Sequence, residues 1–257
     1  MSRIGKPRWS RWSRKIRVLL VADARNIARE PPLWISVLMP WVLALGLRFV
    51  MPMVSLVAAP WVDLELYRVH IAAFLLLIPS MMIGWVVGFL LLDERDERVF
   101  AAIEVTPLGR GGFLRYRMAA LMIVVALTSA GVHICAGLVQ ISLGATLVAA
   151  LLASLSAPLL ALGLVAFAAN KVEGLAIAKL GSVLVMLPIL GSLVGGRFAS
   201  VGLALPGGWA LRVLELELEG AGAESAGSVV VQLGIGLVLA TLYGALLLSR
   251  AGRRVER

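Results

Sequence analysis

Long runs of apolar residues, separated by short polar or charged stretches, are the dominant pattern along this chain. An α-helix rises 1.5 Å per residue, so about 20 apolar residues cross a hydrocarbon core of about 30 Å. Inside such a core the backbone must satisfy its own hydrogen bonds, which a helix does within a single segment. The pattern predicts six membrane-spanning helices, over residues 33–56, 70–92, 118–140, 143–170, 175–194 and 229–249.

Composition agrees with a membrane protein and excludes an ordinary soluble domain. The 257 residues are 60% hydrophobic and 15% charged, with a mean hydropathy of +0.95. Soluble domains are about 45–50% apolar and about 25% charged. The first apolar run begins only at residue 33 and lacks a short signal-like core, so we expect it to remain as a span. The expected fold class is an all-α membrane protein, with residues 1–257 forming a single transmembrane domain.

Basic residues predict the orientation of the spans. Of the 24 lysines and arginines, 19 fall in segments that are cytoplasmic if the amino terminus is cytoplasmic; Arg68, Arg197 and Arg212 fall in external segments. Such an imbalance is typical of membrane proteins, whose cytoplasmic loops are rich in lysine and arginine. Both termini are therefore expected in the cytoplasm, including a tail over residues 250–257. The net charge of +9 indicates topology and attraction to anionic lipid, not nucleic-acid binding.

Residues 1–32 have the pattern of an amphipathic helix that lies in the membrane interface. Trp9, Trp12 and Ile16 recur at helical spacing among basic residues, which places tryptophan at headgroup depth and arginine near lipid phosphate. The prolines at 31 and 32 end this helix. Two roles stay open, a mechanical element or an arm that only contacts lipid.

A charged stretch of about 25 residues, 93–117, separates the second and third predicted spans on the cytoplasmic side. A plain connection between helices needs about 2 to 8 residues. Acidic residues at 93, 94, 96 and 97 predict a helix start, where negative charge favours the positive end of the helix dipole. Glu94 and Arg98 have the spacing of a helical ion pair. Pro107 and the glycines at 109, 111 and 112 predict a sharp turn after this helix.

Val99, Phe100 and Ile103 form an apolar stripe on this otherwise polar helix. Acids and bases are equally numerous in the stretch, which suits an anionic lipid surface poorly. An exposed stripe flanked by both signs of charge suits a helix that binds in a groove of another protein. We therefore expect a protein partner here in preference to lipid or to a solvated connector.

Three stretches resemble type-2 ABC exporter permeases. DERDERVFAAIEVTPLGRGGFLRYR, residues 93–117, is similar to the cytoplasmic loop of these proteins, including its Thr-Pro turn. AANKVEGLAIAKL, residues 168–180, resembles the junction of the fourth and fifth spans in drug and antibiotic exporters of this group. LPGGWALRVLELELEG, residues 205–220, resembles the segment before the last span. The chain is thus identified as fluoroquinolone-export-permease-like.

The resemblance implies six spans, an amino-terminal interfacial helix and a cytoplasmic coupling helix between spans two and three. It also implies two permease subunits, of the same or a homologous chain, that work with ABC ATPase subunits in a bacterial plasma membrane. The chain contains no GxxxxGK[ST] P-loop, because none of its four lysines has that context. We therefore expect ATP and Mg²⁺ in the partner ATPase, and neither a cofactor nor a metal site in this chain.

The coupling segment is the expected binding site for the ATPase. Its apolar stripe would enter a groove of the ATPase, and the neighbouring charges would set the register. The residues expected to take part are Glu94, Arg95, Glu97, Arg98, Val99, Phe100, Ile103, Thr106 and Pro107.

The expected function is export of a hydrophobic or amphiphilic compound, drug-like or lipid-like, driven by ATP hydrolysis in the separate subunit. The alternative is a membrane scaffold or assembly factor that transports nothing and recruits a cytoplasmic partner. An intramembrane enzyme is not expected, since the chain has no HExxH or GxSxG motif and no intramembrane pair of carboxylates.

Arg48, Met81, Met82 and His133 are candidates for the substrate pathway. Arg48 lies roughly 22 Å along the first span by helical rise, and it either snorkels outward or attracts an anionic substrate from a cavity. The methionines suit an adaptable lining, although apolar residues of spans more often pack or contact lipid. For His133, a buried, hydrogen-bonded packing role is favoured over a role in the pathway.

The external segment, residues 195–228, contains two conflicting patterns. The alternation in LELELE favours a strand or a one-sided amphiphile. The family resemblance implies short helices that dip back into the membrane, so both alternatives stay open. The four glutamates of the segment predict an acidic outer mouth.

Overall fold

The computed structural model describes residues 31–104, 109–220 and 223–255. Six of its helical segments are long and apolar enough to cross a membrane, and the described residues contain no strand, which confirms the predicted all-α, six-span fold. The spans are α2 (Pro31–Ala58), α3 (Arg68–Asp96), α5 (Gly109–Ala136), α6 (Leu143–Ser154) with α7 (Ser156–Phe167), α8 (Lys171–Val194) and α11 (Ala223–Val255). The interfacial helix predicted for residues 1–32 lies outside the described residues, apart from the two prolines that begin α2.

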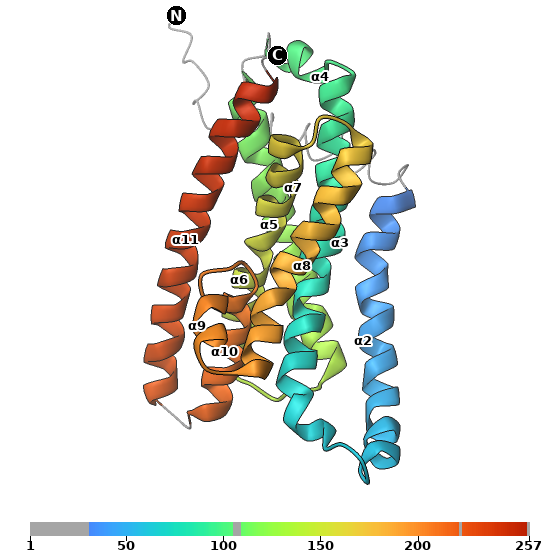
Figure 1. Cartoon of the computed structure of the whole chain (residues 1–257), viewed down its shortest axis with the longest axis vertical. Coiled ribbons are helices and arrows are strands. Elements are labelled where there is room, and N and C mark those ends of the chain that lie inside the picture. The colour runs from blue at the N-terminus through green and yellow to red at the C-terminus, as the bar shows by residue number, and fades with distance from the viewer. Residues whose placement is uncertain (1–30, 105–108, 221–222, 256–257) are drawn as a thin grey trace, which may run out of the picture.

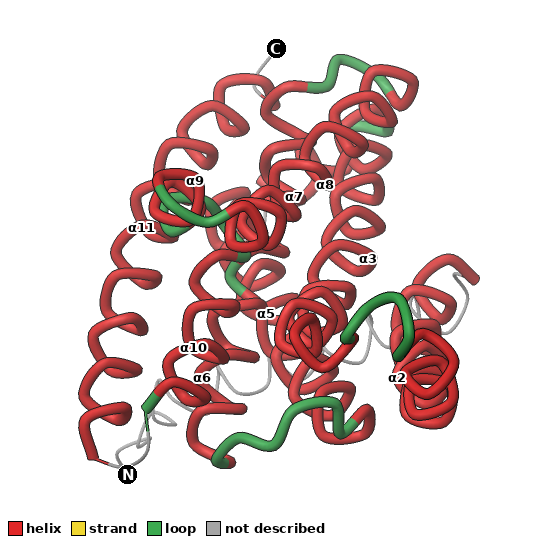
Figure 2. The backbone as a smooth tube through the Cα atoms, turned by 60° about the horizontal axis from the view of Figure 1, so that its bottom comes forward, coloured by secondary structure: helices red, strands yellow, loops and turns green. Residues whose placement is uncertain are grey.

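α3 and the α6–α7 pair form the centre of the bundle. Burial is 67% for the apolar window of α3 and 83% for that of α6–α7, but only 11% for α2, 17% for α8 and 22% for α11. α2 and α11 stand on opposite sides of the molecule in Figure 1, and Figure 2 shows α2 set apart at one edge. The outer helices therefore turn their apolar faces away from the protein, as expected of helices that contact lipid.

Small residues let α3 and α7 approach closely. A side chain on Gly84 would begin 3.0 Å from Ala157, and one on Gly88 would begin 3.1 Å from Ala161. Two small residues four positions apart on each helix form the packing motif that membrane helices use, because lipid supplies little hydrophobic drive for association. This contact fixes α3 against α7 at the centre of the bundle.

Another face of α3 packs large side chains against glycines of α8. Trp85 covers Gly181, where an added Cβ would lie 2.6 Å from the indole ring, and Phe89 covers Gly174 in the same way. The Trp85 indole N–H donates to Ser182 Oγ at 2.9 Å. The central helix is therefore fitted to α7 on one face and to α8 on another.

The predicted fourth span, residues 143–170, is broken into α6 and α7 at Leu155. Pro158 lies in the first turn of α7 and has no N–H to donate, and its ring clashes with the carbonyl four residues earlier. Ser80 Oγ of α3 donates to the Ala153 carbonyl at 2.7 Å beside the break. A backbone group at the break is thus satisfied inside the protein, as membrane depth requires.

The external segment is helical, so the strand alternative is wrong. α9 (Arg197–Gly202) folds back along α8, and α10 (Gly208–Glu219) packs against α6 and α11. Trp209 is fully buried, and its indole N–H donates to the Leu203 carbonyl at 2.9 Å. Gly207 has a φ of +96°, which a residue with a side chain rarely adopts, and it forms the turn into α10.

Most of the described basic residues gather at the end of the bundle where α3 ends, α5 and α8 begin and α11 ends. Figure 1 shows these helix ends together with α4 (Val99–Glu104) at the top of the molecule. η1 (Leu64–Tyr67) lies at the opposite end. The residues at the α4 end are Arg95, Arg98, Arg110, Arg115, Arg117, Lys171 and Arg250. This distribution supports the cytoplasmic assignment of the α4 end.

Candidate functional site

The acidic cluster of the charged stretch closes a helix and does not start one. Asp93, Glu94 and Asp96 lie in the last turn of α3, and Glu97 is its C-cap. The predicted helix start at 93 is therefore wrong. Carboxylates at a helix C-terminus face the negative end of the dipole, so they need cationic partners nearby.

Cations from two other helices, α8 and α5, supply these partners. Lys171 Nζ, at the start of α8, lies 2.8 Å from Asp93 Oδ1. Arg117 of α5 pairs with Glu94, and the guanidinium of Arg117 also lies over the Phe113 ring, 5.6 Å from its centroid. The end of α3 is consequently tied to α5 and to α8.

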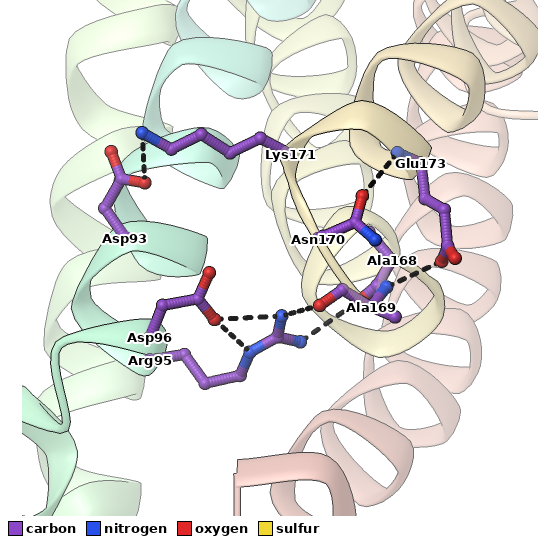
Figure 3. A network of polar contacts seen from close by, with 8 residues as sticks. All are labelled: Asp93, Arg95, Asp96, Ala168, Ala169, Asn170, Lys171 and Glu173. Atoms are coloured by element: carbon purple, nitrogen blue, oxygen red, sulfur yellow. Dashed lines mark hydrogen bonds and ion pairs between the residues drawn. The ribbon is translucent and has the colours of Figure 1, made fainter.

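Arg95 binds the junction between α7 and α8. Its guanidinium donates to the carbonyls of Ala168 and Ala169, at 2.9 Å each, and to Asp96 Oδ1. Ala168 is the C-cap of α7, so the arginine caps a helix C-terminus where positive charge is favoured. Figure 3 shows the fork of Arg95 reaching across from α3 to both carbonyls.

A capping arrangement begins α8 at the same junction. The Asn170 side chain accepts from the Glu173 backbone N–H at 2.9 Å, and the Glu173 carboxylate accepts from the Ala169 N–H at 2.9 Å. This resembles a capping box, except that the carboxylate accepts from the N–H one residue before the N-cap Asn170. We call the set Asp93, Arg95, Asp96, Asn170, Lys171 and Glu173 the α3–α8 clasp (Figure 3). The sequence interpretation did not assign a role to the last three, although the spacing of Asn170 and Glu173 is a readable capping signal.

Phe100 is buried in the chain itself, and the predicted exposed stripe is wrong in this respect. α4 follows α3 after a break at Arg98, whose φ is +58°. Phe100 is only 3% exposed and meets Phe113 edge to face, with ring centroids 6.2 Å apart. Val99 and Ile103 are half-buried. The apolar side of α4 therefore packs down on α5, because α5 extends further than the predicted span.

The outer side of α4 is small and charged. It consists of Glu97, Arg98, Ala101, Ala102 and Glu104, all exposed, and we call it the α4 tip. Glu104 is held by Arg110 of α5 at 2.5 Å. The tip is thus a projecting surface with a fixed underside.

The predicted glycine turn is only partly correct. Gly109 has a φ of +64° and starts α5, but Gly111 and Gly112 lie within that helix. Most of the segment 93–117 is therefore helical extension of the spans on either side. Thr106 and Pro107 lie outside the described residues.

The four pathway candidates do not converge on one site. Arg48 is exposed and donates to the Cys135 carbonyl at 2.8 Å, near the end of α5, which favours the outward alternative. Met81 and Met82 are half-buried in α3. His133 is 4% exposed, as expected of a packing residue, but its Nε2 has no hydrogen-bond partner among the described residues.

A polar cluster at the outer end was not anticipated. His70 of α3 lies 3.0 Å from Ser192 Oγ of α8, and Ser192 donates to Glu215 of α10 at 2.7 Å. Arg212 donates to Glu215 and to Glu219. Glu215 and Glu219 are therefore partly neutralised by Arg212, whereas Glu217, among the residues described, accepts only from the Ser142 backbone N–H.

Comparison with known proteins identifies the family. Residues 23–248 match the family model described as "Fluoroquinolones export permease protein Rv2686c-like". The fluoroquinolones export permease protein Rv2686c of Mycobacterium tuberculosis (strain ATCC 25618 / H37Rv) is 30% identical over 195 residues, which are 74% of this chain and 77% of the relative. The protein MT2760 of strain CDC 1551 / Oshkosh matches to the same extent. No solved structure matches this chain significantly. The chain therefore belongs to the Rv2686c-like family of fluoroquinolone export permeases.

Proposed function

We propose that the chain is the permease subunit of an ATP-driven exporter of the ABC type, with the α4 tip as the docking surface for a separate ATPase. Family membership supports export, and the lack of a P-loop motif in the 257 residues favours a motor on a separate polypeptide. The proposed complex contains two permease subunits in a bacterial plasma membrane, with both termini of the chain cytoplasmic.

One observation carries the assignment of the docking surface: α4 projects from the bundle, follows α3 in the chain and is fixed to α5. Phe100 and Glu104 hold α4 on α5, while Glu94 and Arg117 join α5 to the end of α3. The α3–α8 clasp joins the same end of α3 to α7 and α8. A force on the α4 tip would therefore reach four spans through packed contacts and ion pairs.

The α4 tip has the chemistry of a helix that binds in a groove. Ala101 and Ala102 allow a partner backbone to approach, and Glu97, Arg98 and Glu104 supply both signs of charge for register. Phe100 then acts as a positioning residue for α4. This differs from the expectation that Phe100 itself enters the ATPase.

The proposed substrate is a drug-like amphiphile, by analogy with the relatives that export fluoroquinolones. The apolar outer faces of α2, α8 and α11 are available to lipid and to the second permease subunit. The proposed path of export runs along the spans that the α3–α8 clasp joins.

Transport into inverted membrane vesicles from the native host tests the proposal. We expect uptake of a fluoroquinolone that requires ATP and continues when a protonophore collapses the proton gradient. Ala101→Trp should abolish uptake, because a bulky ring at the α4 tip blocks a groove. Ala59→Trp, an exposed alanine at the opposite end of the bundle, is the matched control and should transport normally.

Two results would overturn the proposal. Uptake driven by the proton gradient and independent of ATP would exclude an ABC exporter. Correctly inserted protein that takes up nothing in any energised state would instead favour the scaffold alternative.

A further inference from the structure

An apolar groove runs along the outside of the bundle between α8 and α11, with α7 as its floor. Its cavity volume is about 810 Å³, and Leu205 and Pro206 close it toward the outer end. Its walls include Leu160 and Gly163 of α7, Gly181 and Leu184 of α8, and Leu246 and Arg250 of α11. Figure 1 shows α8 and α11 on either side of α7. None of Arg48, Met81, Met82 and His133 lines this groove.

Glycine and aliphatic side chains make the groove deep and apolar. A Cβ placed on Gly163 would meet no atom within 4 Å, so the floor of the groove is open at this position. Leu180, Leu184 and Leu246 on its rims are 72%, 43% and 65% exposed. These rims continue the outward faces of α8 and α11, which a membrane protein turns to lipid.

Arg250 is the one charged residue that lines the groove, and it lies at the cytoplasmic end. Its guanidinium is placed over the Phe167 ring, 5.4 Å from the centroid. Within the described part of the chain it makes no ion pair, unlike Arg95, Arg110, Arg117 and Lys171 at the same end. The ring holds the cation in place and leaves its N–H donors available to an anion.

We propose that the groove binds an anionic phospholipid of the cytoplasmic leaflet, with the phosphate on Arg250 and an acyl chain along α7. Charge complementarity favours this occupant. Arg250, at headgroup depth, lacks an ion pair within the described residues and attracts an anion, and the apolar groove beside it suits a hydrocarbon chain. The volume is in the range of about 300–1,000 Å³ typical of organic-ligand sites. The bound chain would fill the groove between α8 and α11.

Native mass spectrometry of the full-length chain in neutral detergent tests the site, with phosphatidylglycerol and phosphatidylcholine of identical acyl chains as probes. We expect the wild type to retain phosphatidylglycerol in preference to phosphatidylcholine. Arg250→Gln should weaken phosphatidylglycerol binding about fivefold, since one basic residue at the surface contributes about that factor. Gly163→Leu should weaken both lipids, because its side chain occupies the floor of the groove.

Two control variants distinguish lipid binding in the groove from lipid binding elsewhere on the protein. Arg115→Gln removes an exposed cytoplasmic arginine outside the groove, and Gly46→Leu fills a position on α2 with no atom within 4 Å. Both should bind lipid as the wild type does. Equal retention of the two lipids by the wild type, or matching losses for Arg250→Gln and Arg115→Gln, would overturn the proposal.

The same preparation excludes the other occupants. A fluoroquinolone that displaces phosphatidylglycerol from the wild type would assign the groove to the transported compound. A disulfide-linked dimer of Leu246→Cys, made in a Cys135→Ala background, would assign it to a second copy of the chain. Either result would overturn the lipid assignment, while ATP-driven export remains testable separately.

Discussion

Arg95 is expected to contribute far more to stability than Lys171, although both tie α3 to the α7–α8 junction. Arg95 is 13% exposed and donates to two carbonyls at 2.9 Å. Hydrogen bonds to charged groups contribute about 1.5–3 kcal/mol each, so Arg95→Gln should lower the free energy of unfolding by about 3 kcal/mol. Lys171 and Asp93 are 63% and 34% exposed, so solvent screens their ion pair and its net contribution to stability is small.

Unfolding in mixed micelles with a rising fraction of dodecyl sulfate, followed by tryptophan fluorescence, measures both variants. Arg95→Lys should fall between Arg95→Gln and the wild type, because an ammonium cannot reproduce the planar fork that binds two carbonyls. Equal losses for Arg95→Gln and Lys171→Gln would refute the reasoning. That result would mean that the two carbonyls find other donors when the guanidinium is removed.

Three further substitutions follow from the packing. Gly84→Leu should prevent folding, as seen by loss of the monodisperse peak in size-exclusion chromatography, because even a Cβ there lies 3.0 Å from the Ala157 backbone; Gly46→Leu should fold normally. Phe100→Ala should lower the free energy of unfolding by about 3 kcal/mol, whereas Phe100→Leu should preserve export; loss of export in a stably folded Phe100→Leu would contradict its positioning role. Arg48→Gln should cost about 1 kcal/mol of stability and leave the range of exported compounds unchanged in resistance profiling; an altered range would restore Arg48 to the pathway.

The spans were predictable because each is defined by its own residues. An apolar run of sufficient length must be a helix in a bilayer, whatever lies beside it. Pro158 marks the break in the fourth predicted span within the sequence itself, and the Asn170 and Glu173 pair marks the start of α8.

The charged stretch was less predictable, because its structure depends on partners distant in sequence. The four carboxylates of this stretch predict a helix start on local grounds. In the structure they end a helix, because Lys171 and Arg117, distant in sequence, pair with Asp93 and Glu94. The inward direction of Phe100 likewise depends on Phe113, whose helix extends well before the predicted third span. The sequence periodicity of α4 predicts that Val99, Phe100 and Ile103 share one face. Only the position of α5 decides whether that face is buried.

LELELE shows the opposite failure, in which a local pattern misleads. Leu214 is buried while Leu218 is 51% exposed, so the leucines do not share one face. Arg212 reaches Glu215 and Glu219, which are three and seven positions away and lie on one helical face. Packing of α10 into the bundle overrides the alternation of period two.

Photo-crosslinking from position 101 tests the central claim, that the α4 tip receives the ATPase, most directly. A benzophenone amino acid replaces Ala101 at the tip or, as the control, Ala59 at the opposite end, and export is verified before irradiation of native-host membranes. The account predicts an adduct from position 101 with a polypeptide that contains a P-loop, and none from position 59. A chain that exports normally but gives no such adduct from position 101, or gives it from position 59, would contradict the account.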